Sequence, residues 1–199
     1  MSRIFAGVAA LVGWSGLALQ LVLMVQQLGV ALGLWRFFGY LTILTNLAAA
    51  LAATAIALGS FGQLAGPRAR LMAATSITLV GLVYSLALRS LWTPEGWQKL
   101  ADIALHDAAP ALFVLAWLLA GHTSLRWREL GWAMAPAIAY AAYALVRGQI
   151  DGWYAYWFLD PRSQGPGQML ASIAALTAVT GVIGAACIGI DRLLARRAR

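Results

Sequence analysis

The stretch "FFGYLTILTNLAAALAATAIALG" runs from Phe37 to Gly59, and its last two thirds are almost entirely apolar. A transmembrane helix needs roughly 20 mostly apolar residues, so this run is long enough to cross a membrane. Its first third, however, carries Thr42, Thr45 and Asn46. Residues three and four apart share one face of a helix, so the sequence predicts a polar stripe near one membrane surface.

The apolar pattern recurs along the whole chain, which has 199 residues, 62% hydrophobic and 11% charged. A soluble domain carries roughly 25% charged residues. Backbone groups in lipid must be hydrogen-bonded within their own segment, which favours helices. The sequence predicts an all-α integral membrane protein, a single domain over residues 1–199 built as a bundle of six transmembrane helices. The expected spans are residues 4–26, 38–59, 70–91, 103–121, 129–147 and 167–190.

The basic residues predict the orientation. An even number of spans puts both termini on one side, together with most of the arginines. That side holds Arg3, Arg68, Arg70, Arg126, Arg128, Arg192, Arg196, Arg197 and Arg199. The other side holds Arg36, Arg89, Lys99, Arg147 and Arg162. Lys and Arg are enriched in cytoplasmic loops, so both termini are expected in the cytoplasm. The Arg-rich and Ala-rich composition is typical of a bacterial protein, which favours the inner (plasma) membrane.

Most tryptophans and tyrosines fall near the outer ends of the predicted spans. They are Trp35, Tyr40, Trp92, Trp97, Trp153, Tyr154, Tyr156 and Trp157. Such residues are typical of the aromatic belt at a membrane interface.

The fourth predicted span opens with a second polar group, in "LADIALHDAAPALFVLAWLLAGH". Asp102 lies four residues before His106, so its carboxylate is within reach of the imidazole on one helix face. Asp107 points roughly 100° away and is the less suitable orienting group. Pro110 has no N–H to donate to the carbonyl of His106, which predicts a bend.

Thr42 and His106 enter from the same side and are expected at a similar depth. A hydroxyl becomes a nucleophile when a base takes its proton, so these two residues are candidates for a catalytic pair. Asp102 or Asp107 would tune the histidine, and Asn46 or Thr45 would donate to an oxyanion. The alternative for each of these residues is helix packing through hydrogen bonds within or between spans.

No metal or other cofactor is expected. At a rise of 1.5 Å per residue, His122 lies about 24 Å from His106, too far for a shared metal. The single cysteine, Cys187, lies in the last apolar run and is expected to be a small buried side chain. No nucleic-acid-binding module can be placed on the chain.

The segments "YLTILTNL", "LHDAAP" and "RGQIDGWYAYWFLDPRSQGPG" resemble the androgen-induced-protein family, which has bacterial six-span relatives. Animal members, among them the androgen-dependent regulator of tissue factor pathway inhibitor, are intramembrane threonine hydrolases of fatty acid esters of hydroxy fatty acids. The family's Phe-Leu-Thr turn corresponds to Tyr40-Leu41-Thr42, which implies that Thr42 is the nucleophile and His106 its partner. Tyr154 and Trp157 depart from the family pattern, which has Trp and Pro at those positions.

The leading hypothesis is therefore a lipid-ester hydrolase whose substrate is a membrane lipid or fatty acid ester, with the site near the extracytoplasmic face. Arg89 and Arg147 lie at outer span ends and are candidates to bind the carboxylate or headgroup of a substrate. An equally weighted alternative is that both side chains extend toward the lipid headgroups of the membrane and bind no specific ligand. The alternatives are a non-enzymatic carrier or channel for a small solute and a membrane scaffold. A continuous pathway needs polar groups through the full depth, which the apolar inner halves of the second and fourth spans lack.

Overall fold

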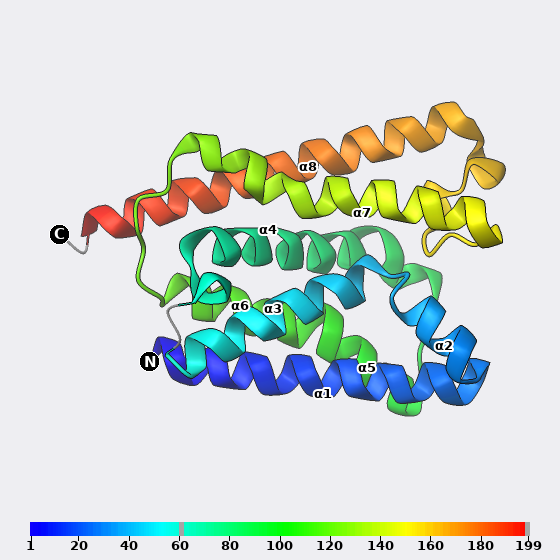
Figure 1. The fold of residues 1–199 in the computed structure, drawn as a ribbon, viewed down its shortest axis with the longest axis horizontal. Helices are drawn as coiled ribbons and strands as arrows, with labels where there is room; N and C mark the ends of the chain where they lie inside the picture. Colours follow the sequence, from blue (N-terminus) through cyan, green and yellow to red (C-terminus); the bar gives the residue numbers. More distant parts are fainter. Residues whose placement is uncertain (60–61, 198–199) are drawn as a thin grey trace.

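The structure is a computed structural model that describes residues 1–59 and 62–197, and these residues form helices and connecting turns without a strand (Figure 1). The helices are α1 (Ser2–Leu28), α2 (Val30–Phe37), α3 (Leu41–Ala57), α4 (Pro67–Val83), α5 (Gly96–Ile103), α6 (Ala109–Leu118), α7 (Leu130–Asp151) and α8 (Pro161–Arg197). Two π-helical turns interrupt the α-helical pattern, Tyr84–Leu88 after α4 and Ala104–Ala108 between α5 and α6.

Five helical stretches in the described part of the chain are long and apolar enough to cross a membrane. They are Ser2–Leu28, Pro67–Leu91, Gly96–Leu118, Trp127–Asp151 and Pro161–Arg197. The pair α2 and α3 makes a sixth if it is counted as one span, bent by 76° at its break. The predicted all-helical membrane class is confirmed, and helix length and hydropathy make the chain an integral membrane protein.

The second span differs from its prediction in one respect. It was expected as one helix over residues 38–59, but α3 begins only at Leu41, and the separate helix α2 precedes it. The break falls at Gly39, where a Cβ atom would lie 2.7 Å from the ring of Trp153. Gly39 thus leaves room at the break for an aromatic ring from the loop between α7 and α8.

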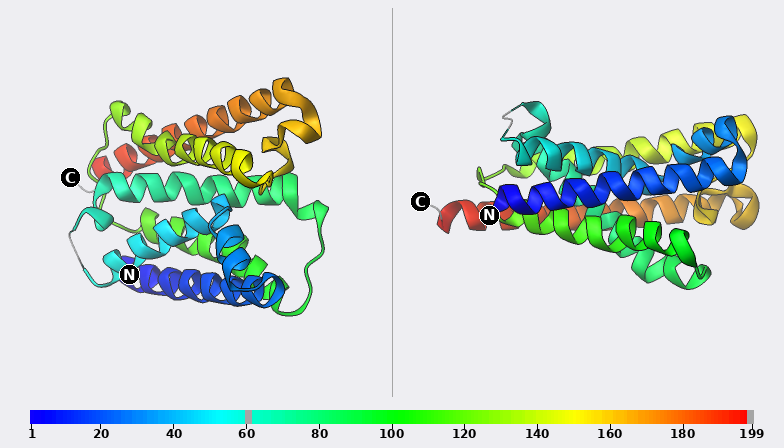
Figure 2. Two further views of the ribbon diagram at one scale, coloured as in Figure 1. Left: turned by 45° about the vertical axis from the view of Figure 1, so that its right-hand side comes forward. Right: turned by 90° about the horizontal axis from the view of Figure 1, so that it is seen from below.

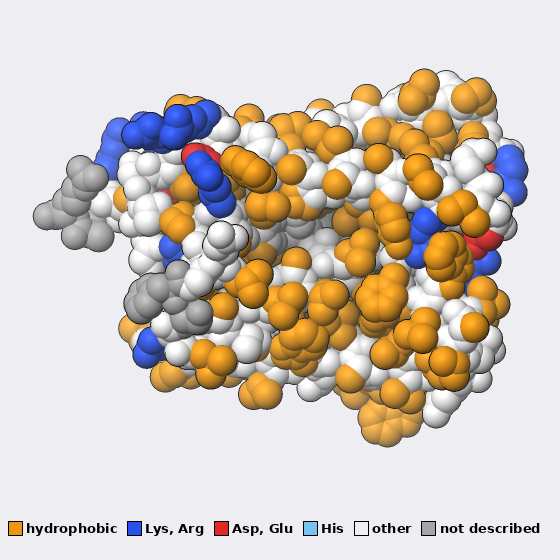
Figure 3. Space-filling model, viewed as in Figure 1, with side chains coloured by type: hydrophobic (Ala, Val, Ile, Leu, Met, Phe, Trp, Pro, Cys, Tyr) orange, Lys and Arg blue, Asp and Glu red, His pale blue; other side chains and the backbone are white. Residues whose placement is uncertain are grey.

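Both termini lie at one end of the bundle, here called the terminal end, and the views in Figures 1 and 2 agree on this. The opposite end, the far end, carries α2, the start of α3 and the loop between α7 and α8 (Figure 1). Helix α4 occupies the centre and contacts α3, α6, α7 and α8. Charged side chains gather at the two ends of the face in Figure 3, and a broad hydrophobic band separates them.

Small residues let the helices approach closely. A Cβ atom on Gly184 would lie 2.9 Å from the Cβ of Ala133, and one on Gly13 would lie 3.3 Å from the Cβ of Ala50. Close packing of small residues is a main source of helix association in membranes. Cys187 is buried among these residues with a free thiol, as the sequence predicted.

Candidate functional site

The structure brings Thr42 and His106 into contact at the far end. Oγ1 of Thr42 lies 3.3 Å from Nε2 of His106, although 64 residues separate them in the sequence. Thr42 is the second residue of α3 and is buried, and the His106 side chain is 15% exposed. The two side chains are therefore largely buried, but the His106 side chain keeps some exposure.

A π-turn and a proline together shape the backbone that carries His106. The N–H of Ala109 donates to the carbonyl of Ala104, one residue further back than in an α-helix, and Pro110 has no N–H to offer. The carbonyl of Leu105 consequently lacks a donor within its own helix. Asn46 supplies one, because its side-chain amide donates to the carbonyl of Leu105 at 3.0 Å and to that of Thr42 at 2.9 Å.

Asn46 therefore links α3 to the π-turn that carries His106, and its amide does not donate to Oγ1 of Thr42. Both of its amide hydrogens are taken up by backbone carbonyls, one on α3 and one on the π-turn. An oxyanion would need a free donor, and this arrangement leaves none on the Asn46 amide, so its role as that donor stays a prediction. Thr45 is buried one turn further along α3 and does not line the cavity beside Thr42.

Asp102, rather than Asp107, is the carboxylate that orients His106. Nδ1 of His106 lies 3.0 Å from Oδ1 of Asp102 and 3.1 Å from the carbonyl oxygen of the same residue. Neither oxygen can donate a hydrogen bond, so the ring hydrogen is assigned to Nδ1, which donates it to the carbonyl oxygen of Asp102. The lone pair of Nε2 is then free to face the hydroxyl of Thr42.

Tyr84 completes this arrangement and was not found from the sequence. Its hydroxyl donates to Oδ2 of Asp102 at 2.5 Å, and its ring stacks on the His106 imidazole with centroids 3.8 Å apart at 14°. One tyrosine thus fixes both the carboxylate and the plane of the histidine. Tyr84 begins the other π-turn, and no local sequence pattern links it to His106.

Asp107 and Arg89 form an ion pair with each other at the bundle surface. Both side chains are substantially exposed, and the Arg89 guanidinium also lies 4.9 Å from the centroid of the Tyr84 ring. Within the described part of the chain, Asp107 makes no hydrogen bond or ion pair with His106. Arg89 would have to leave Asp107, or share it, to bind a ligand carboxylate.

Arg147 is buried and holds two helices together. Its guanidinium donates to the hydroxyl of Tyr143 at 2.7 Å and to the carbonyl of Trp35, and it stacks 3.8 Å from the centroid of the Trp35 ring. These contacts tie α7 to α2. These hydrogen bonds use two of the five N–H donors of the guanidinium, and its buried Nε has no hydrogen-bond partner among the described residues, so a role in ligand binding stays a prediction.

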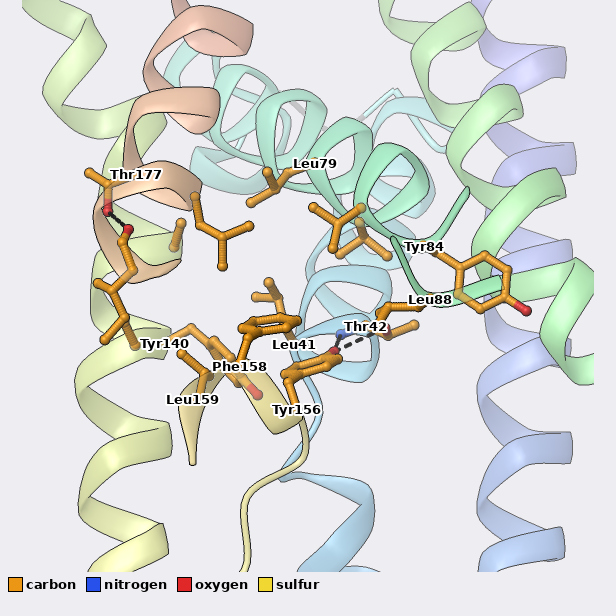
Figure 4. Close-up of a pocket in the computed structure, with 16 residues that line it drawn as sticks. Leu41, Thr42, Leu79, Tyr84, Leu88, Tyr140, Tyr156, Phe158, Leu159 and Thr177 are labelled. Atoms are coloured by element: carbon orange, nitrogen blue, oxygen red, sulfur yellow. Dashed lines mark hydrogen bonds between the residues drawn. The ribbon is translucent and has the colours of Figure 1, made fainter. Parts of the chain in front are cut away.

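Tyr156 is the second functional candidate that the sequence did not reveal. It lies in the loop between α7 and α8, and its hydroxyl is 3.4 Å from Oγ1 of Thr42 and accepts from the Thr42 N–H at 3.4 Å (Figure 4). The first N–H groups of a helix lack internal partners, and the side chain of Tyr40 does not cap α3. Burial raises the pKa of Tyr156, which keeps the hydroxyl protonated and able to donate.

A small cavity opens beside Thr42 (Figure 4). Its volume is about 50 Å³, and its walls are largely apolar, with Leu79, Leu88 and Leu159 among the residues that line it. A space of this size holds a few water molecules or the reacting end of a ligand, not a complete lipid chain. Tyr84 and Tyr156 also line it, so the two tyrosines and Thr42 border one space.

The described residues contain no group of three or more His, Cys, Asp or Glu side chains that could hold a metal ion. His122, at the terminal end, instead lies 2.8 Å from Asp191 through Nδ1.

No family model, no curated protein and no solved structure matches the chain. The chemistry of the site is therefore argued from its own geometry.

Proposed function

We propose that the chain is an intramembrane hydrolase of lipid esters in which Thr42 is the nucleophile and His106 the general base. The observation that carries this proposal is the 3.3 Å contact between Oγ1 of Thr42 and Nε2 of His106, with Nδ1 held by Asp102. A hydroxyl, an imidazole and an orienting carboxylate in this order are the elements of nucleophilic acyl transfer.

The reaction follows from the positions of these atoms. Nε2 of His106 takes the hydroxyl proton while Oγ1 bonds to the ester carbonyl carbon, and the carbonyl oxygen becomes an oxyanion. Collapse of this intermediate breaks the bond to the alcohol oxygen, which receives the proton from His106. Water then attacks the acyl-threonine with His106 again as base, which releases the acid and restores Thr42.

Two features support stabilisation of the oxyanion beside Thr42. The hydroxyl of Tyr156 is a neutral donor next to Oγ1, and the N-terminus of α3 carries the positive end of the helix dipole. Preorganised donors of this kind often make the largest single contribution to acyl-transfer catalysis. Tyr156 takes the place that the sequence assigned to Asn46 or Thr45.

The resemblance to the androgen-induced-protein family supports the same assignment, because its threonine and histidine correspond to Thr42 and His106. Together with the excess of basic residues near the terminal end, it favours a bacterial inner membrane with the far end facing outward. The substrate would then be a lipid or fatty acid ester of that membrane, processed from its outer leaflet.

Ester hydrolysis by the purified protein in liposomes tests the proposal. Wild-type protein should release acid from a long-chain fatty acid ester, Thr42→Ala should be inactive, and Thr42→Ser should keep a measurable fraction of the activity. Thr54→Ala is the matched control, because Thr54 lies on the same helix and bonds Trp14 and the carbonyl of Ala50, away from the site. Full activity in Thr42→Ala would refute the proposal.

A further inference from the structure

A second, larger hollow lies on the lipid-facing side of the bundle, between α3, α4 and α7. We call it the lateral groove, and Figure 3 shows it near the middle of the hydrophobic band. Its volume is about 660 Å³, against about 50 Å³ for the cavity beside Thr42. Pockets for small ligands typically measure about 300–1,000 Å³, so the groove is within the range that holds a ligand.

The groove and the catalytic cavity share a wall. Leu41 and Tyr140 line both spaces, one from the first turn of α3 and the other from α7. Leu41 directly precedes Thr42, and the Tyr140 hydroxyl donates to the carbonyl of Gly39 at 2.9 Å. The two side chains therefore form a partition, with the lipid-facing groove on one side and the nucleophile on the other.

The chemistry of the groove fits a hydrocarbon chain. Its lining is dominated by alanine, leucine and aromatic residues, and it lies along helices that are expected to cross the bilayer. Its polar side chains include Thr45 and Ser76, and Oγ of Ser76 is buried without a hydrogen-bond partner among the described residues.

We propose that the lateral groove admits the acyl chain of an ester substrate directly from the bilayer, and that the substrate reaches Thr42 past the partition of Leu41 and Tyr140. The inference rests on the proposed hydrolase function. It adds that the substrate is resident in the bilayer, with a long chain, and that it arrives sideways rather than from the aqueous face.

Variants that block the groove test the route of substrate entry separately from the catalytic step at Thr42. Ala48 on α3 and Ala139 on α7 line the groove and are exposed, so a tryptophan at either position would fill the groove without entering the core. Ala178→Trp on α8 is the matched control, because Ala178 is exposed and lines neither space. Each variant is assayed with 4-methylumbelliferyl oleate in liposomes and with the short-chain, water-soluble 4-methylumbelliferyl acetate.

We expect Ala48→Trp and Ala139→Trp to lower hydrolysis of the oleate by about tenfold or more, because an overfilled groove excludes the chain. Acetate hydrolysis should stay unchanged in both, and Ala178→Trp should behave as wild type with both esters. Wild-type hydrolysis of the oleate by both groove variants would overturn the inference.

Photolabelling keeps the inference testable if a groove variant loses both activities or if the wild-type protein hydrolyses neither ester. A fatty acyl ester with a mid-chain diazirine is irradiated in liposomes with the catalytically silent Thr42→Ala protein. Crosslinks on groove-lining residues of α3, α4 and α7 support the inference, and crosslinks confined to other faces overturn it. Absence of wild-type turnover with groove crosslinks would count against the hydrolase alone.

Discussion

The rings of Tyr84 and His106 lie face to face, with centroids 3.8 Å apart, and each residue belongs to a π-helical turn. A π-turn inserts one extra residue into a helix, and such turns are frequent at functional sites. Two local irregularities thus place one tyrosine over the proposed general base.

Asp102→Asn should lower kcat by roughly a hundredfold or more, since an Asp→Asn change that reverses the tautomer of a catalytic histidine has effects of that order or larger. The amide of an asparagine can donate to Nδ1, which would move the ring hydrogen to Nε2 and block proton transfer from Thr42. Steady-state ester hydrolysis measures the change. Asp107→Asn is the control and should keep near-wild-type kcat, because Asp107 pairs with Arg89.

Tyr156→Phe should lower kcat by about tenfold or more and leave KM nearly unchanged, because the hydroxyl is proposed to stabilise charge that develops only in the transition state. The phenylalanine ring keeps the stacking against Phe158. Tyr143→Phe is the matched control, since the Tyr143 hydroxyl bonds the carbonyl of Phe38 and Arg147 rather than the site. Equal kinetics for the two variants would remove Tyr156 from the mechanism.

The two histidines should separate activity from stability. His106→Ala should abolish turnover, because no base is then left to accept the hydroxyl proton of Thr42. His122→Ala should keep its activity but unfold more easily, by about 1–3 kcal/mol, because Asp191 loses a buried partner. Thermal unfolding in detergent and the ester assay together check both expectations.

The orientation is testable by cysteine labelling. In a Cys187→Ala background, cysteines introduced at Ser2 and Gln164 should react with a membrane-impermeant maleimide from opposite sides of the membrane. The reason is that Ser2 lies at the terminal end and Gln164 follows the far-end loop (Figure 1). Labelling of both from one side would contradict the membrane arrangement proposed above.

The spans and part of the site follow from local sequence. Apolar runs of sufficient length predict the transmembrane helices, and the spacing of Asp102 and His106 predicts their contact because both lie on one helix. Helix α2 escaped prediction because its 8 residues are too few to cross a membrane, so the sequence placed them between the first two spans. At the bend, Gly39 packs closely against Trp153, which lies more than a hundred residues away in the sequence and could not be linked to it from local pattern.

Tyr84 and Tyr156 are site residues that the sequence could not predict. Each contacts the Thr42–His106 pair from another helix or loop, so only three-dimensional packing brings it there. Tyr156 also fits the aromatic belt that most membrane proteins carry, which masks any functional role. The sequence places Asn46 on the polar face of α3, but its two acceptors, one of them on a π-turn, were not visible in the sequence.

The most direct test of the account is the position of a covalent adduct. A fluorophosphonate probe is incubated with the protein in membranes, and the modified residue is identified by peptide mass mapping. The account predicts one adduct, on Thr42, which is lost in Thr42→Ala and in His106→Ala and only weakened in Thr45→Ala. An adduct on another residue, or undiminished labelling of Thr42→Ala, would contradict the claim that Thr42 is the nucleophile.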